Sequence, residues 1–340
     1  MKIKTLNTIG GRSLMLFLIA LVATGCEKNG DVGIDKTRAP EVLVFELKPG
    51  YSYASTMIMD QTSTFAVGDK TMNTTTKMIM ESEMGINPKT ENGDRALTMS
   101  YTRVAMDNKT GDMAMRYDSD DPTTANGPLA MMGGMVGQPF TIVLDEFNEI
   151  TDVKGIKEVQ QKMDSNPALA QIGQIFADKD QIANMFNLWM TDAFPKDPVG
   201  TGDVWPLNTT MKIPTLGEMT MDGEFELTGF TEYKGHDCAI IDSVATMTID
   251  TSKTGGMMAA MGFKLSGGKI KSRLYWDNKL GWMRGSDNTT EMTLSMTNPG
   301  TGERMEIPMN QTMTLEVTVT ENTATPEEST ESEEPSSETH

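Results

Sequence analysis

The sequence is poor in the residues from which most catalytic and disulfide-bonded sites are built. Its 340 residues include two histidines and two cysteines, which is little material for a histidine-based triad or a cysteine–histidine zinc site. Because Cys26 belongs to the export signal described below, Cys238 is left without a partner for a disulfide within one chain.

Positive charge is scarce as well. The 29 lysines and arginines are outnumbered by 48 acidic residues, and the net charge is −19. A nucleic-acid-binding protein needs a basic surface, so this composition argues against a nucleic-acid partner. The sequence also lacks the G-x-S-x-G, H-E-x-x-H, P-loop and dinucleotide-binding motifs. We therefore expect a protein that is not an enzyme, with no catalytic, cofactor-binding or metal-binding residues.

The first 25 residues have the layout of an export signal. Lys2, Lys4 and Arg12 precede an apolar run over residues 14–23, which is too short to cross a bilayer as a helix. The run ends in Ala-Thr-Gly-Cys at residues 23–26, which resembles the lipobox of bacterial lipoproteins. That resemblance implies that residues 1–25 are a lipoprotein signal peptide and that Cys26 is the lipidation site.

A lipidated Cys26 would carry two or three acyl chains, which together anchor a protein stably to a membrane. Position 27 holds glutamate, not the aspartate that favours inner-membrane retention in some bacteria, so the outer membrane is the expected location. The sequence leaves open which side of that membrane the protein faces. The alternative is an ordinary cleaved signal peptide with an incidental cysteine.

The rest of the chain divides into three parts. Residues 26–40 are polar and contain glycine, which predicts a flexible tether. Residues 41–320 form one β-rich domain. Residues 321–340 are rich in Glu, Ser and Thr and nearly devoid of apolar residues, so they cannot offset the entropy of ordering and we expect a disordered acidic tail.

Alternation of apolar and polar residues runs through the domain. In residues 312–320, Met313, Leu315, Val317 and Val319 alternate with polar residues, mostly threonine, and residues 97–102 repeat the pattern. A period of two places one set of side chains on a buried face and the other in water, which is typical of an antiparallel sheet. Turn sequences rich in Asn, Asp and Gly separate these runs.

The centre of the chain has a different period. Apolar residues between 155 and 195 recur at helical spacing, and Asn166-Pro167 is typical of a helix start. We therefore expect an α+β fold, in which a large curved, mainly antiparallel, half-barrel-like sheet carries a central insert of two or three helices.

Five short motifs carry a resemblance to a known family. They are residues 47–51 (Leu-Lys-Pro-Gly-Tyr), 137–141, 149–155, 198–205 and 275–282 (Tyr-Trp-Asp-Asn-Lys-Leu-Gly-Trp). Their order is similar to that in a family of uncharacterised, β-rich lipoproteins of Gram-negative bacteria, a domain of unknown function. The resemblance covers about residues 42–318. It implies a fold and no catalytic residues.

Methionine is unusually frequent, with 31 residues, many in M-x-M pairs such as Met57/Met59 and Met78/Met80. Three interpretations remain open. Methionine replaces Leu and Ile as core filler, it lines an adaptable apolar cavity, or its thioethers bind Cu(I). The low aromatic content of 6% favours filler, because bulky core residues are few.

Other chemically interesting residues have simpler readings. The acidic run at residues 118–121 does not match the spacing of a calcium loop and reads as a turn. We expect His236 to lie in a hairpin turn and Cys238 to be an unreactive thiol. The four tryptophans are expected to anchor the core or the hairpins. We expect a membrane-anchored protein with a role in binding or scaffolding at the cell envelope, directed at an apolar ligand or a partner protein, with Cu(I) or metal sequestration as the alternative.

Overall fold

The computed structural model describes most of the central part of the chain. The residues described are 33–67, 70–91, 93–126, 129–146, 150–155, 194–213, 217–250, 262, 264–297, 302 and 304–321. The predicted signal peptide, Cys26 and nearly all of the predicted acidic tail lie outside them.

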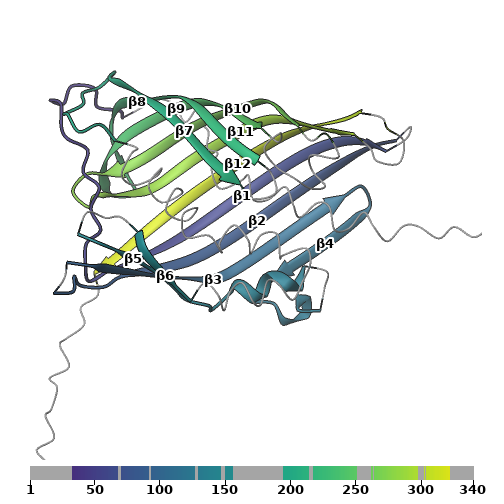
Figure 1. The fold of residues 1–340 in the computed structure, drawn as a ribbon, viewed down its shortest axis with the longest axis horizontal. Helices are drawn as coiled ribbons and strands as arrows, with labels where there is room; N and C mark the ends of the chain where they lie inside the picture. Colours follow the sequence, from purple (N-terminus) through teal and green to yellow (C-terminus); the bar gives the residue numbers. More distant parts are fainter. Residues whose placement is uncertain are drawn as a thin grey trace, which may run out of the picture.

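Twelve strands form a single antiparallel sheet (Figure 1). They are β1 (Tyr51–Val67), β2 (Lys70–Ile86), β3 (Arg95–Thr110), β4 (Met113–Asp118), β5 (Phe140–Leu144), β6 (Ile150–Lys154), β7 (Val204–Ile213), β8 (Gly217–Tyr233), β9 (His236–Asp250), β10 (Lys264–Asp277), β11 (Trp282–Thr297) and β12 (Arg304–Glu321). Their order across the sheet is β6-β5-β3-β2-β1-β12-β11-β10-β9-β8-β7, and β4 also pairs with β3. The first long strand therefore lies beside the last one at the centre of the sheet.

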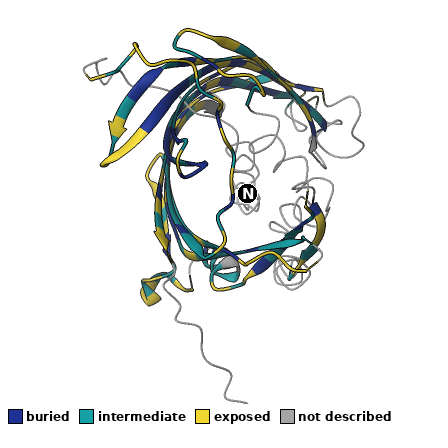
Figure 2. Cartoon of the chain, turned by 90° about the vertical axis from the view of Figure 1, so that its left-hand side faces the viewer, coloured by how far each residue is buried: buried dark blue, intermediate teal, exposed yellow. Residues whose placement is uncertain are grey.

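The α+β prediction was wrong. Among the described residues, the helical segments are the short 3-10 turns η2 (Pro122–Thr124) and η3 (Ala130–Met135), and no helix there is both long and apolar enough to cross a membrane. The expected helical insert at residues 155–195 lies outside the described residues, apart from Gly155 and residues 194–195. The described sheet curves around its own interior (Figure 2), and the apolar clusters of the described residues draw on distant strands of that one sheet.

Short turns join several neighbouring strands of the described chain, as the sequence predicts. Between β8 and β9 the turn residues Lys234 and Gly235 have φ values of 51° and 82°. Two consecutive residues with positive φ fit a tight hairpin whose twist matches that of its strands. Lys234 is the described non-glycine residue with positive φ, and its ammonium group pairs with Glu316 at 2.5 Å.

The two faces of the sheet differ in the way the alternation predicts. In β12, Met309, Gln311, Met313 and Val317 are buried, whereas the residues between them are exposed or partly exposed. The same parity holds along the registers of β1, β2 and β11. We call the buried side the inner face and the exposed side the outer face.

One end of the sheet is closed by the chain ahead of β1. Residues 35–48, which we call the strap, run across this end from β8 to β1, the purple segment in Figure 1. Asp35 and Phe230 exchange two backbone hydrogen bonds, and the Glu46 amide donates to the Gly281 carbonyl at 2.9 Å. The strap overlaps the last residues of the predicted tether, residues 26–40, and residues 26–32 of that segment lie outside the described residues.

Aromatic and aliphatic side chains fill this closed end. Leu43 and Leu47 of the strap are 4% and 1% exposed, and they pack into clusters that contain Trp276 and Trp282. The Trp276 indole also donates to the Val44 carbonyl at 3.2 Å. Most of the buried aromatic residues therefore gather at this end of the sheet, whereas the cluster that contains Met59 and Met78 consists mainly of methionine.

Candidate binding face

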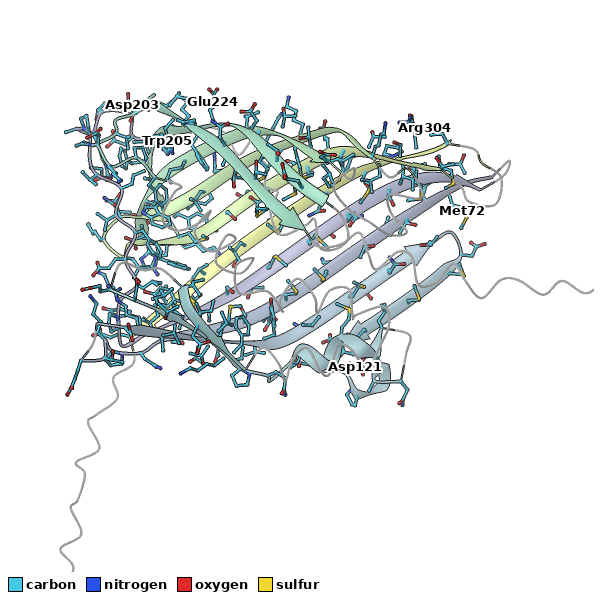
Figure 3. The ribbon with its side chains drawn as sticks, viewed as in Figure 1. Met72, Asp121, Asp203, Trp205, Glu224 and Arg304 are labelled. Atoms are coloured by element: carbon cyan, nitrogen blue, oxygen red, sulfur yellow. The ribbon has the colours of Figure 1, made fainter. Side chains whose placement is uncertain are left out.

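A row of four methionines crosses the middle of the inner face. Met106, Met78, Met59 and Met313 are register partners on β3, β2, β1 and β12. All four are nearly inaccessible, with exposed fractions of 2%, 5%, 0% and 7%. Figure 3 shows sulfur atoms along these central strands. The M-x-M pairs of the sequence thus place their thioethers on one side of the sheet, as expected for strands.

The methionine surface extends beyond this row. Its further buried members lie on β7, β8, β9, β11 and β12 and are Met211, Met219, Met221, Met247, Met292 and Met309. Methionine is unbranched and flexible, so a surface made of it repacks more easily than one made of branched side chains. This face is at once a packed core and an adaptable apolar surface.

A polar row lies next to the methionine row. Asn108, Thr76, Gln61, Gln311 and Thr290 are register partners on five neighbouring strands, from β3 through β2, β1 and β12 to β11. Their exposed fractions range from 0% to 7%. The Asn108 amide donates to the Thr76 hydroxyl at 2.7 Å. We refer to these five residues as the polar row.

Several polar atoms of this region have no hydrogen-bond partner. They are Gln61 Oε1, Gln311 Nε2 and Thr290 Oγ1 of the polar row, and Oδ1 of the neighbouring Asn288. A buried polar atom left unpaired costs about 1–3 kcal/mol, and native proteins leave few such atoms. Four of them within one small area of the sheet call for an explanation other than packing.

Charge is segregated between the two faces. Among the side chains that the structure describes, the inward-facing positions of the central strands carry none. The partly buried Arg95 and the buried Arg284 lie near the closed end, where they contact Leu47 and Asp277, respectively. The outer face is charged. There, the register partners Asp60, Lys77 and Asp107 alternate in sign across β1, β2 and β3, an arrangement that supports strand pairing. Figure 3 shows Glu224 on β8 at the outer rim.

A shallow hollow of about 610 Å³ is lined by residues 60–62, 75–77, 107–109, 114–116 and 310–312. Its exposed lining residues, such as Asp60 and Lys77, belong to the outer face, and the next inward-facing side chains, Met59 and Met78, do not line it. Four of its lining residues, Gln61, Thr76, Asn108 and Gln311, belong to the polar row, so the hollow crosses the sheet at the level of this row.

Arg103 organises the acidic residues next to it on the outer face. Its guanidinium group donates to both carboxylate oxygens of Asp118, at 3.1 and 2.9 Å, and to Glu81 at 2.9 Å. These hydrogen bonds from Arg103 hold the pKa of Asp118 below its ordinary value. Asp118 is thus an ion-pair partner at a turn, and no group of three or more metal-ligating His, Cys, Asp or Glu side chains occurs within the described ranges.

The other residues singled out in the sequence have structural places. His236 begins β9 directly after the hairpin turn. Cys238 is buried, and burial is the main cause that raises the pKa of its thiol to about 12. Trp276 and Trp282 are core residues of the closed end. Cys26, the predicted lipidation site, lies outside the described residues.

Sequence reasoning did not identify the polar row. Gln61 continues the alternation of Met57 and Met59 on β1, and Gln311 precedes Met313 in the same way on β12. A glutamine at an inward position of an alternating strand was the available signal. That the two lie side by side follows only from the β1–β12 pairing.

A family model described as "Family of unknown function (DUF6263)" matches residues 92–283, which is more than half of the chain. The chain belongs to this family. The DUF6263 match begins just before β3 and ends within β11, so it covers one of the five strands of the polar row in full, β3, and all of β4 to β10. No curated protein matches the chain.

Solved structures resemble the chain at low identity. A lipovitellin structure, described by its lipid–protein interactions, is 11% identical with a TM-score of 0.35. The match covers 82% of this chain, but only 26% of the lipovitellin chain. An outer membrane channel from Pseudomonas putida is 6% identical with a TM-score of 0.24, and 83% and 100% of the two chains are covered. A DUF1329 family protein from Desulfovibrio piger is 8% identical with a TM-score of 0.13, and the coverage is 82% and 88%. These low scores indicate neither the ligand nor the partners of this chain.

Proposed function

We propose that this protein is a lipid-anchored, non-catalytic binder of an apolar ligand at the bacterial outer membrane, with the inner face of its sheet as the binding surface. The observation that carries the proposal is the composition of that face. Flexible methionines and uncharged polar side chains cover its middle, while charge is kept to the outer face and the closed end. Adaptable, uncharged surfaces of this kind suit ligands rich in hydrocarbon.

A lipid on Cys26 would also orient the domain. Asp35 is hydrogen bonded to β8 at the closed end, and eight residues lie between it and Cys26. A fully extended chain of that length spans about 30 Å. The closed end would then stay near the membrane surface, and the opposite end of the sheet would point away from it.

The test uses the mature chain from residue 26 onward with Cys26→Ser, exported as a soluble protein. We expect an organic extract of the purified protein to contain a lipid or other apolar compound in near-stoichiometric amount by mass spectrometry. In parallel, radiolabelled palmitate should label the wild-type protein and not the Cys26→Ser protein. An extract no richer in apolar compounds than that of an unrelated exported protein would contradict ligand binding, and an unlabelled wild-type protein would contradict the anchor.

Cu(I) sequestration is a second candidate, favoured by the row of four methionines on adjacent strands. Thioethers are soft ligands that suit Cu(I). If the row binds Cu(I), the soluble protein should compete with a chromogenic Cu(I) chelator, and Met59→Leu with Met78→Leu should abolish the competition. Met219→Leu, at a buried methionine on β8, is the matched control. No competition by the unsubstituted protein would exclude this candidate.

A further inference from the structure

We propose that the polar row is the site that holds the uncharged hydrogen-bonding group of a single-chain amphiphile, such as the glycerol and ester of a monoacylglycerol, while its acyl chain lies on the methionine surface. This inference rests on the proposed ligand-binding function and names the class of ligand.

The first argument is the set of unpartnered atoms. Gln61 Oε1 accepts hydrogen bonds, Gln311 Nε2 donates them, and Thr290 Oγ1 does both. Gln61 and Gln311 are direct register partners, as are Gln311 and Thr290, so the three atoms belong to neighbouring positions on β1, β12 and β11. They are 93% or more buried and lack partners. A ligand group that contains hydroxyl and carbonyl oxygens would satisfy both the donors and the acceptors.

The second argument is charge. A carboxylate or phosphate placed at the polar row would be buried without a counter-ion, because the described inward-facing side chains of the central strands are uncharged. Burying an unpaired charge is far more costly than burying a hydrogen-bonded neutral group. The row therefore favours a neutral head group over an anionic one.

The third argument is the surroundings of the row. The row is flanked by methionines on the inner face. The next inward-facing residues on one side of it are Met59, Met78 and Met313, and those on the other side include Met292 and Met309. The row is closed to solvent, so a ligand reaches it only when the side chains around it repack. Flexible methionines allow that rearrangement, and after it they form an apolar surface that an acyl chain can contact.

The experiment compares three probes of equal chain length at pH 8, with the Cys26→Ser mature chain: a monoacylglycerol, the corresponding fatty acid, which is ionised at this pH, and the corresponding alkane. The triple variant Gln61→Met, Gln311→Met and Thr290→Val keeps side-chain volume and removes the polar atoms. Thr64→Val is the matched control, since Thr64 is exposed on the outer face of β1 and its hydroxyl already has a partner, Asn73, at 3.0 Å.

We expect the unsubstituted protein to bind the monoacylglycerol at least about tenfold more tightly than the fatty acid, and the triple variant to bind it about tenfold more weakly, the size expected from losing one or two neutral hydrogen bonds. Alkane binding should be unchanged, Thr64→Val should bind like the unsubstituted protein, and thermal unfolding should show the triple variant at least as stable. If the triple variant and the unsubstituted protein bind the monoacylglycerol equally well, and neither prefers one head group, then the polar atoms are satisfied by buried water only. That result would overturn this inference and leave the proposed function standing. Failure of the unsubstituted protein to bind any of the three probes would instead count against the proposed function.

Discussion

The carboxylate of Asp277 ties the turn between β10 and β11 to the guanidinium of Arg284. One carboxylate oxygen accepts from Arg284 at 3.0 and 2.8 Å, and the other accepts from the backbone amides of Lys279 and Leu280. Both side chains are buried, with Asp277 5% and Arg284 9% exposed. This pair fixes the turn on which the strap rests.

Removing the carboxylate should therefore be costly. We expect Asp277→Ala to lower the free energy of unfolding by about 3–5 kcal/mol, because it leaves Arg284 buried without its counter-charge. Asp107→Ala is the control, since Asp107 forms an exposed pair with Arg116 at 3.6 Å and should change stability by less than about 1 kcal/mol. Denaturant unfolding measures both, and equal losses in the two variants would contradict the structural role of Asp277.

Gly281 should resist substitution for two separable reasons. Its φ is 74°, and a Cβ there would lie 2.7 Å from the backbone nitrogen of Glu46 in the strap. Gly267 has a similar φ of 65° but open space around it. We expect Gly267→Ala to cost about 1 kcal/mol, from backbone strain alone, and Gly281→Ala to cost clearly more. Faster hydrogen exchange at the Glu46 amide in Gly281→Ala alone would confirm displacement of the strap, and identical behaviour of the two variants would argue against it.

Acid should weaken the contact between Arg103 and Asp118. The folded pKa of Asp118 is lowered by its hydrogen bonds from Arg103, so its contribution to stability is present above the unfolded value of about 4 and is lost as pH falls through the lower folded value. We expect Arg103→Met to reduce the loss of stability between pH 5 and pH 2, measured by denaturant unfolding. Arg116→Met, at an exposed pair, should leave that pH dependence nearly unchanged. An unaltered profile in Arg103→Met would show that this pair does not contribute.

Cys238 should be unreactive in the folded protein. Its thiol is buried, and its pKa is raised to about 12, so almost no thiolate is present near neutral pH. In the Cys26→Ser protein, where it is the remaining cysteine, iodoacetamide at pH 8 should modify it only in denaturant, as measured by mass spectrometry. Rapid modification without denaturant would show that β9 opens readily.

The sequence predicted the strands well, because a period of two is a local signal. Met313, Leu315 and Val317 were expected on one face of a strand, and β12 places them there. The fold class was wrong, because apolar residues at helical spacing between 155 and 195 were taken to add a helical layer, whereas the described core is built from the curved sheet and the strap.

The polar row was beyond the reach of the sequence for a different reason. Each of its residues appears as an isolated polar residue in its own strand. That Gln61, Gln311 and Thr290 form a group depends on strand order and register, which are set by contacts between parts of the chain far apart in sequence. A single-residue shift in one register would move the amide to the other face of the sheet.

The pairing of β1 with β12 also constrains how the chain reaches its native state. Tyr51 is aligned with Glu321, so the seam at the middle of the sheet joins the first long strand to the last. Local hairpins can form early, but β1 and β12 can pair only after the last strand is present. Contacts between residues so far apart in sequence slow folding. Until then, β1 keeps one edge unpaired, and a partly synthesised chain would be exposed to aggregation or to chaperone capture at its centre until its last strand arrives.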